Sequence, residues 1–248
     1  MNNDAVVIGG LGVVGTATRR MLNITPYYDL DYAGISAEEL LDKEYIFLCL
    51  PTPTIDGVCD VSRIRKYFEI LGPDHVYIIR STVTPGTSRG LAEEFDAPVL
   101  SCPEFLTEAT AHVECFHPDL LVLGADDGML LNEVWERFFA GVQAGHIVTT
   151  DTVTAELIKY AVNTFYATKV LFANALYDVT EKLDVDYDVV RDAMYDRKWI
   201  GNNHLTVPWK GKRGVNGKCL PKDLEAFATF TNHRFFDVMH TFNARWTE

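Results

Sequence analysis

The stretch Ala5–Leu22, AVVIGGLGVVGTATRRML, gives the clearest signal of architecture in this chain. It begins with a short apolar run, passes through Gly10-x-Gly12-x-x-Gly15 and ends in a segment of helical character. Glycines at this spacing permit a tight turn, and they let a pyrophosphate approach the helix N-terminus closely. A strand, this motif and a helix in that order predict a dinucleotide-binding βαβ unit.

The second strand of such a unit usually ends in an acidic residue that accepts hydrogen bonds from the adenosine ribose. The segment PYYDLDYAG offers Asp29 and Asp31. Asp31 best fits the end of the strand, and its carboxylate favours NAD over NADP. The alternative is that both aspartates only form a solvated strand end.

The chain up to residue 148 alternates short apolar runs with helical patterns, which predicts an α/β domain with a Rossmann-type doubly wound parallel sheet. Because the runs are continuously apolar, we expect strands that are buried on both faces. The expected strands are Ala5–Ile8, Tyr28–Leu30, Tyr45–Leu50, Val76–Ile79, Val99–Leu100 and Leu120–Leu123. We therefore assign residues 1–148 to an NAD-binding domain.

The pattern changes to helix near Asp151. Residues 152–183 contain neither proline nor glycine and have helical periodicity, which predicts one long helix. A second helix is expected over 186–195, a loop over 196–219 and a last helix from near Asp223. These segments predict an all-α domain over residues 149–248, built on the long central helix.

Three polar residues of the long helix, Glu156, Lys159 and Asn163, are spaced i, i+3 and i+7 and form one stripe. A lysine beside an apolar wall can stabilise an oxyanion or take part in proton transfer. An asparagine can hold a hydroxyl or a water. The alternative is a solvated helix face with an ion pair, and the spacing alone leaves both interpretations open.

Composition disfavours several classes of protein. The net charge of −13 argues against nucleic-acid binding, which needs clustered lysine and arginine. No apolar run reaches the length of about 18 residues that a membrane-spanning helix needs. The five cysteines are an odd number without a CxxC pair, so we expect reduced thiols in a cytoplasmic protein and neither a disulfide framework nor a metal site.

The segment 214–223, GVNGKCLPKD, places Cys219 between Lys218 and Lys222. It is too polar and too rich in glycine to be core. Neighbouring cations favour the nucleophilic thiolate, and glycines let a substrate approach the backbone closely. The alternative is a turn that happens to contain a cysteine.

Six segments, in order along the chain, resemble the UDP-glucose/GDP-mannose dehydrogenase family. They are GLGVVG (10–15), LPTPTIDGVCD (50–60), STVTPGT (81–87), PEFLTEATA (103–111), AELIKYAVNTFYATKVLFANAL (155–176) and GVNGKCLPKD (214–223). Members of this family oxidise the C6 hydroxymethyl of a nucleotide sugar to a carboxylate and reduce two NAD. The resemblance implies this activity here, with UDP-glucose as the expected substrate, and it suggests a role in surface polysaccharide synthesis.

The resemblance implies catalytic roles for Cys219, Lys159, Asp223, Glu104, Thr82 and Asn163. Cys219 would attack the aldehyde left by the first oxidation, giving a thiohemiacetal and then a thioester that water hydrolyses. Lys159 would stabilise the oxyanions, and together with Asp223 it would hold a water. Glu104 would position or activate the hydrolytic water.

The family pattern also implies the binding residues. Those for the cofactor are Gly10, Gly12, Val13, Val14, Gly15, Asp31, Thr52, Thr82 and Glu104. Those for the substrate are Glu104, Phe105, Leu106, Lys159, Asn163, Arg213, Gly217 and Lys222. Thr82 would lie beside the cofactor, Asn163 would hold the sugar and Gly217 would leave room for it.

The chain departs from the family pattern at several positions. Cys102 replaces the asparagine before PEF, GVNG replaces GFGG, and Trp199 replaces an arginine that reaches the substrate of the neighbouring subunit. Arg197 or Arg213 could compensate for that arginine. The family's third domain, which covers the nucleotide, is expected to be absent, so that the chain would be a short form.

Three functions follow as alternatives. A nucleotide-sugar 6-dehydrogenase would form two NADH per substrate and depend on Cys219. A single-step alcohol dehydrogenase of the β-hydroxyacid type would form one NADH without needing Cys219. A non-catalytic NAD-binding or scaffold protein would bind NAD without turnover.

We also expect a homodimer through residues 152–183, because a helix that is apolar on several faces must be buried.

Overall fold

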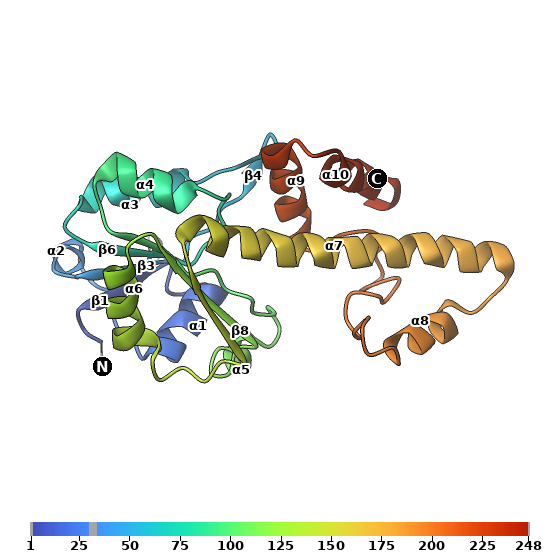
Figure 1. The fold of residues 1–248 in the computed structure, drawn as a ribbon, viewed down its shortest axis with the longest axis horizontal. Coiled ribbons are helices and arrows are strands. Elements are labelled where there is room, and N and C mark those ends of the chain that lie inside the picture. The colour runs from blue at the N-terminus through green and yellow to red at the C-terminus, as the bar shows by residue number, and fades with distance from the viewer. Residues whose placement is uncertain (1, 30–33, 248) are drawn as a thin grey trace. The chain divides into compact units, whose positions relative to one another are not determined.

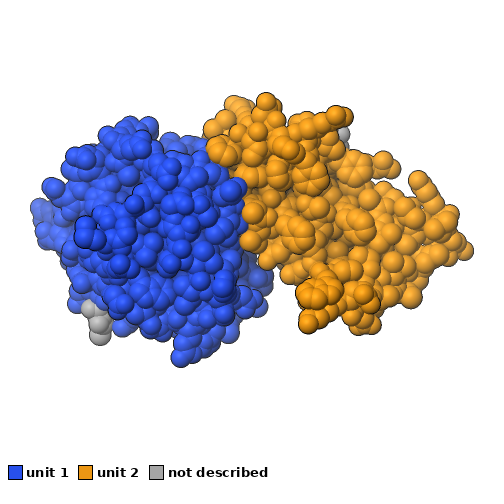
Figure 2. Space-filling model, viewed as in Figure 1, with its two compact units in different colours: residues 1–53, 59–159 blue, residues 54–58, 160–248 orange. Residues whose placement is uncertain are grey.

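The computed structural model of the chain describes residues 2–29 and 34–247. By its internal contacts the chain divides into two compact units (Figure 2). Unit 1 comprises residues 1–53 and 59–159, and unit 2 comprises residues 54–58 and 160–248. The predicted ribose-binding Asp31 lies outside the described residues.

Unit 1 is built on a sheet that, within the described residues, has seven strands in the order β2-β1-β3-β6-β7-β8-β9. The strands are β1 (Ala5–Ile8), β2 (Tyr27–Tyr28), β3 (Tyr45–Leu48), β6 (Val76–Ile79), β7 (Val99–Ser101), β8 (Leu120–Ala125) and β9 (His146–Thr150). Neighbouring strands are parallel, apart from the antiparallel pair β7 and β8. The predicted Rossmann-type class is confirmed.

Helices cover both faces of this sheet (Figure 1). One face carries α1 (Val13–Leu22), α6 (Gly128–Val134) and the π-helical turn η1 (Trp135–Phe139), and the short α5 (Ala111–Glu114) lies beside α1. The other face carries α2 (Ala37–Leu41), α3 (Ser62–Leu71) and α4 (Thr87–Phe95). Side chains alternate between the two faces along each strand, so Val7 and Phe47 pack on the first and Ile8 and Ile46 on the second.

The sheet places the candidate residues at one edge. Because β1 pairs with both β2 and β3, the strand order reverses at β1, which is where ligands bind in open α/β sheets. The loops that follow β1, β3, β6 and β7 leave the carboxyl ends of neighbouring parallel strands. These four loops contain the glycine motif and the PTPT, STVTPGT and PEF segments.

Strand β9 of this sheet and a separate two-stranded hairpin were not predicted from the sequence. Strand β9 is mostly exposed and half polar, so it has no continuous apolar run. The hairpin of β4 (Thr54–Ile55) and β5 (Val58–Cys59) has strands of only two residues. Its turn uses Asp56 and Gly57 in the left-handed region, at φ 51° and 78°.

Unit 2 is helical. Helix α7 runs over Thr152–Leu183, as predicted, and contributes its later turns to this unit. It is followed by α8 (Tyr187–Tyr195), α9 (Leu220–Thr231) and α10 (Arg234–Thr247). Helix α9 begins three residues before the predicted Asp223, because Pro221 lies in its first turn, where the missing N–H of proline costs nothing.

Two clusters of apolar side chains hold unit 2 together. Leu171 of α7 packs with Leu224 of α9 and Met239 of α10, and Ala173 packs with Tyr187 of α8 and Leu205. Among the helices that the structure describes, none has the length and apolar character needed to cross a membrane.

Candidate active site

The loop after β1 forms a cradle at the N-terminus of α1. A Cβ added to Gly15 would lie 2.1 Å from the carbonyl oxygen of Gly9, and one on Gly10 would lie 2.5 Å from Cβ of Tyr27. Gly12 is the N-cap of α1 and offers no side chain to the first N–H groups of the helix. This geometry fits a bound pyrophosphate, which accepts hydrogen bonds from such groups.

The loops after β3 and β6 are bonded to each other. The Oγ1 of Thr52 donates to the carbonyl oxygen of Thr82 at 2.6 Å. The Oγ of Ser81 donates to the carbonyl oxygen of Leu50 at 2.8 Å and accepts from its N–H at 2.9 Å. Thr52 and Thr82, both predicted to bind the cofactor, are therefore brought together at the carboxyl edge of the sheet.

Lys159 is a buried cation held by the loop after β7. Only 6% of the residue is exposed, and its Nζ donates to the carbonyl oxygen of Glu104 at 2.6 Å. The Nζ also lies 3.5 Å from Oε1 of Glu104 and 5.2 Å from the centre of the Phe105 ring. The interpretation of this stripe as a solvated helix face is thus wrong.

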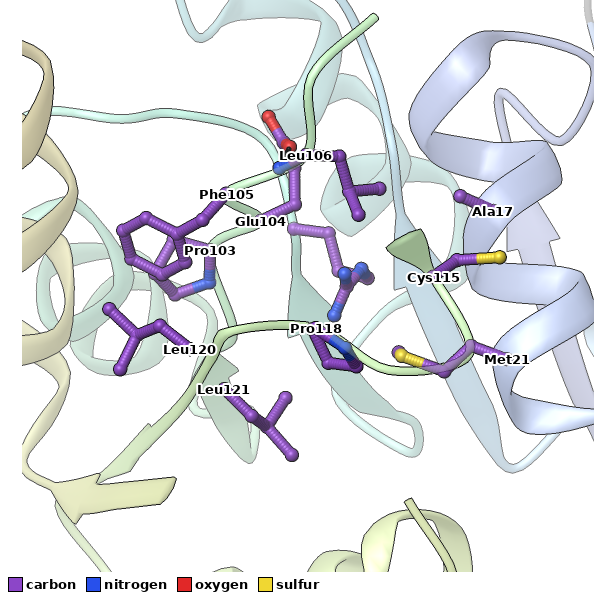
Figure 3. Close-up of a pocket in the computed structure, with 11 residues that line it drawn as sticks. Ala17, Met21, Pro103, Glu104, Phe105, Leu106, Cys115, Pro118, Leu120 and Leu121 are labelled. Carbon is purple, nitrogen blue, oxygen red and sulfur yellow. Dashed lines mark hydrogen bonds between the residues drawn. The ribbon is translucent and has the colours of Figure 1, made fainter. Parts of the chain in front are cut away.

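Glu104 is fixed by its own loop and borders a small cavity. Its Oε2 accepts from the N–H of Leu106 at 2.7 Å. The cavity has a volume of about 20 Å³, enough for one water. Figure 3 shows Glu104, Phe105 and Leu106 at this cavity, with Ala17 and Met21 of α1 on the other side.

Arg80 also lines this cavity and is 4% exposed. Its Nη1 donates to Sγ of Cys102 at 3.0 Å. Burial raises the pKa of the Cys102 thiol, while the Arg80 charge opposes this shift. Cys102, which departs from the family pattern, therefore serves as a buried acceptor for Arg80. The sequence does not indicate this pair, because its members directly follow two different strands, β6 and β7.

Glu156 belongs to the polar stripe of the long helix but is not among the predicted site residues. It is 2% exposed, and its carboxylate accepts from the N–H of Gly86 at 2.6 Å and of Ser88 at 2.8 Å. Both donors belong to the N-terminus of α4. Burial raises the pKa of Glu156 to about 7, against the opposing effect of these N–H groups.

In unit 2, Cys219 is the N-cap of α9. It is exposed, whereas Cys49, Cys59, Cys102 and Cys115 are buried. The N-terminus of a helix of this length favours an anion such as a thiolate.

Asp223 lies one turn after Cys219 in α9 and is 1% exposed. Its Oδ2 accepts from Nδ2 of Asn163 at 2.6 Å, and its Oδ1 accepts from Nζ of Lys222 at 2.5 Å. Asn163 is 6% exposed and is fixed on α7, one turn after Lys159. The structure thus brings together three of the predicted residues of unit 2 in one hydrogen-bonded group.

The backbone before Cys219 bends at its glycines. Gly214 and Gly217 have φ angles of 75° and 91°, and a Cβ on Gly214 would lie 2.8 Å from Oδ1 of Asn243. A Cβ on Gly217 would meet no described atom within 4 Å. Space next to Gly217 is compatible with its predicted role beside the sugar, which stays a prediction.

Arg213 has partners inside unit 2. Its Nη2 donates to the carbonyl oxygen of Asn174 at 2.8 Å and lies 2.7 Å from Oδ1 of Asp178. Its guanidinium also lies 4.8 Å from the centre of the Tyr177 ring. These contacts give Arg213 a structural role, and its contact with substrate stays a prediction. Trp199, at the place of the family arginine, is 86% exposed.

The fold and these residues define a dinucleotide-binding oxidoreductase, and comparison with protein families makes the class specific. The NAD binding domain of the UDP-glucose/GDP-mannose dehydrogenase family matches residues 28–141, and the central domain of the same family matches residues 153–244. The chain therefore belongs to the UDP-glucose/GDP-mannose dehydrogenase family, with NAD as its cofactor.

Individual relatives agree with this assignment. A UDP-glucose 6-dehydrogenase of Rickettsia conorii is 32% identical over 219 residues, which cover 84% of this chain and 49% of the relative. A UDP-glucose 6-dehydrogenase of Bacillus subtilis is 34% identical over 200 residues, which cover 75% of this chain and 44% of the relative. This chain spans about half the length of the curated relatives that it matches.

A solved structure gives the same result for the fold. The structure of a UDP-glucose dehydrogenase from the hyperthermophilic archaeon Pyrobaculum islandicum matches with a TM-score of 0.82 at 26% sequence identity. The match covers 97% of this chain and 67% of that chain.

Proposed function

We propose that this chain oxidises the C6 hydroxymethyl of a nucleotide sugar in two NAD-dependent steps, converting UDP-glucose to UDP-glucuronate. The observation that carries the proposal is an exposed thiol, Cys219, at the N-cap of α9, one turn before the buried Asp223. A single alcohol oxidation does not need a nucleophile, whereas the oxidation of an aldehyde to an acid does. The names of the curated relatives support UDP-glucose as the substrate.

NAD, when bound, accepts one hydride in each of the two oxidations. The loop that contains Gly10, Gly12 and Gly15 would hold its pyrophosphate against the start of α1, where Val13 and Val14 lie. Thr52 and Thr82 would border the cofactor from the neighbouring loops, which their hydrogen bond joins.

In the first oxidation the substrate hydroxyl must lose a proton while its oxygen becomes a carbonyl. A lysine ammonium has three donors, so Lys159 can bond Glu104 and a substrate oxygen at the same time. A buried cation stabilises developing negative charge more strongly than an exposed one. We assign Lys159 to the substrate oxygen, and Asp223 to a water that takes the proton.

The second oxidation begins when the thiolate of Cys219 bonds to the aldehyde carbon and the carbonyl π bond opens to an oxyanion. Lys159 and Asn163 would stabilise this oxyanion by donating hydrogen bonds to it. Oxidation of the thiohemiacetal gives a thioester. Water then adds to the thioester carbon and the C–S bond breaks, so the products are a carboxylate and the regenerated thiol.

Glu104 is assigned to the hydrolytic water. Its carboxylate is fixed by the N–H of Leu106 and by Lys159, and it borders a cavity that can hold a water. A carboxylate in this position can take a proton from the attacking water. Phe105 and Leu106, the next residues of this loop, would line the substrate.

The test is the amount of NADH formed at the endpoint with UDP-glucose and a panel of other nucleotide sugars. Two NADH per sugar, lost in Cys219→Ala and retained in Glu93→Gln, a control at an exposed residue of α4, is the expected result. One NADH per substrate that persists in Cys219→Ala would instead identify a single-step alcohol dehydrogenase. NAD binding without turnover of any sugar would instead identify a non-catalytic NAD-binding protein.

We also propose a homodimer through α7. Phe165, Phe172 and Val179 recur at seven-residue steps on this helix and are 62%, 55% and 46% exposed. Residues at that spacing lie on one side of a helix, and a second copy can bury such a stripe. Light scattering should give twice the chain mass for the wild type and one chain mass for Phe172→Glu. Glu181→Lys, on the opposite side of α7, is the control, and a monomeric wild type would refute the dimer.

We place this activity in the cytoplasm. A thiolate nucleophile must stay reduced, and cytoplasmic thiols are kept reduced. The role in surface polysaccharide synthesis stays a suggestion of the family resemblance. Fluorescence microscopy of a tagged chain would test the location, and a signal confined to the cell envelope would contradict it.

A further inference from the structure

Glu156 joins two elements of unit 1 that are far apart in the sequence. Its carboxylate belongs to α7, and the two N–H groups that it bonds belong to Gly86 and Ser88 at the start of α4. The two oxygens take one bond each, at 2.6 Å from Gly86 and 2.8 Å from Ser88. A carboxylate with both oxygens bonded in this way has a fixed orientation.

The element that Glu156 holds is the STVTPGT loop. Residues 81–87 lead from β6 directly into α4, and Gly86 is the N-cap of that helix, with a left-handed φ of 96°. Thr82, in the same loop, accepts the hydrogen bond from Thr52. The loop is therefore anchored at its end by Glu156 and near its start by the loop after β3.

The second element held by the same part of α7 is the loop after β7. Lys159 follows Glu156 by three residues and donates to the carbonyl oxygen of Glu104 at 2.6 Å. Residues three apart on a helix lie on the same face. One turn of α7 thus holds the loops that leave β6 and β7, which are adjacent parallel strands.

The start of α7 has an anchor that does not involve Glu156. The Oγ1 of Thr152 donates to Oδ2 of Asp126 at 2.8 Å, and Asp126 also accepts two hydrogen bonds from Arg89 of α4. Helix α7 can therefore stay in place when the carboxylate of Glu156 is lost. The carboxylate of Glu156 fixes the position of the loop end at Gly86.

We propose that Glu156 is a positioning residue for the proposed oxidation. It sets the place of the loop with Thr82 relative to the turn of α7 that carries Lys159. This inference rests on the proposed function and extends it to a residue that touches neither substrate nor cofactor.

The test compares Glu156→Gln and Glu156→Asp with the wild type. A carboxamide has one acceptor oxygen, and its NH2 group would face one of the two N–H groups. An aspartate keeps the carboxyl group on a shorter arm. Glu93→Gln makes the same change of carboxyl to carboxamide on an exposed residue of α4 and serves as the matched control. The kinetic constants, the Kd for NAD by calorimetry and the folded fraction by circular dichroism are measured for each variant.

We expect kcat of Glu156→Gln to fall by about 10- to 100-fold, the range for a small displacement of reacting groups, with the KM for the sugar within about threefold. The Kd for NAD should rise several-fold, Glu156→Asp should lie between, and Glu93→Gln should match the wild type. A Glu156→Gln protein with kcat and NAD affinity within about twofold of the wild type would overturn the proposal. So would a loss that the unfolded fraction fully explains.

The outcome for the wild type separates this inference from the proposed function. A wild type that binds NAD but turns over no nucleotide sugar refutes the proposed function. The NAD affinity then decides the positioning role by itself: a several-fold weaker Kd in Glu156→Gln supports it, and an unchanged Kd refutes it.

Discussion

The buried carboxyl of Glu156 makes a specific prediction about stability and pH. Burial raises its pKa to about 7 from the ordinary value of 4.5. In the folded protein this group therefore holds its proton more tightly than it does in the unfolded chain. The stabilisation from this protonation is fully present below about pH 4.5, and it is lost as the pH rises through about 7.

The magnitude follows from the same values. A shift of one pKa unit corresponds to about 1.36 kcal/mol. The rise of the Glu156 pKa from 4.5 to about 7 therefore corresponds to about 3 kcal/mol of unfolding free energy. The residue is 2% exposed, so screening by solvent reduces this value little. Glu156→Gln has no titrating group at the site and should lack this part of the pH dependence.

The assay is the unfolding free energy of unit 1 between pH 4.5 and 7.5, from hydrogen exchange at the amides of β3 and β6. Other groups titrate alike in both proteins, so the wild-type value minus that of Glu156→Gln isolates this carboxyl. We expect this difference to fall by about 3 kcal/mol as the pH rises. A flat difference for Glu156→Gln would refute the reasoning, and one that grows with pH would show that the N–H groups of α4 outweigh burial.

Three further predictions concern unit 1. Cys102→Ala removes the acceptor of the buried Arg80 and should lower the unfolding free energy by about 2 kcal/mol in urea titrations, with a smaller loss in Cys102→Ser. Phe68 is fully buried, and the centre of its ring lies 3.9 Å from that of Tyr77. Phe68→Ala should therefore lower the unfolding free energy by about 4 kcal/mol in the same titrations, and a loss below about 1 kcal/mol would contradict the packing described. Gly10→Ala places a Cβ 2.5 Å from that of Tyr27 and should weaken NAD binding at least tenfold by calorimetry, whereas an unchanged Kd would exclude the glycine loop as the cofactor site.

Much of the fold could be read from the sequence because its signals are local. Strand β1 and helix α7 have their predicted bounds, since a continuous apolar run and a helical period over 32 residues do not depend on distant contacts. The antiparallel direction of β8 could not be read in this way. A strand buried on both faces is continuously apolar in either direction, and only pairing with β7 sets its orientation.

The candidate site shows the same division. The sequence indicated the polar stripe on α7, but it left open whether Glu156 and Lys159 pair with each other in solvent. The structure gives them separate partners. Glu156 bonds Gly86, which lies 70 residues away along the chain, and Lys159 bonds Glu104, which lies 55 residues away. Sequence spacing does not report such contacts.

The sequence by itself determined which elements form and which side chains are chemically suited to the site. The glycine motif specifies its own turn, and Pro221 suits the first turn of α9, where its missing N–H costs nothing. Only the tertiary structure decided which of these groups are buried and what they bond. A buried polar group must find a partner wherever the fold provides one, and at Glu156 that partner is the start of another helix.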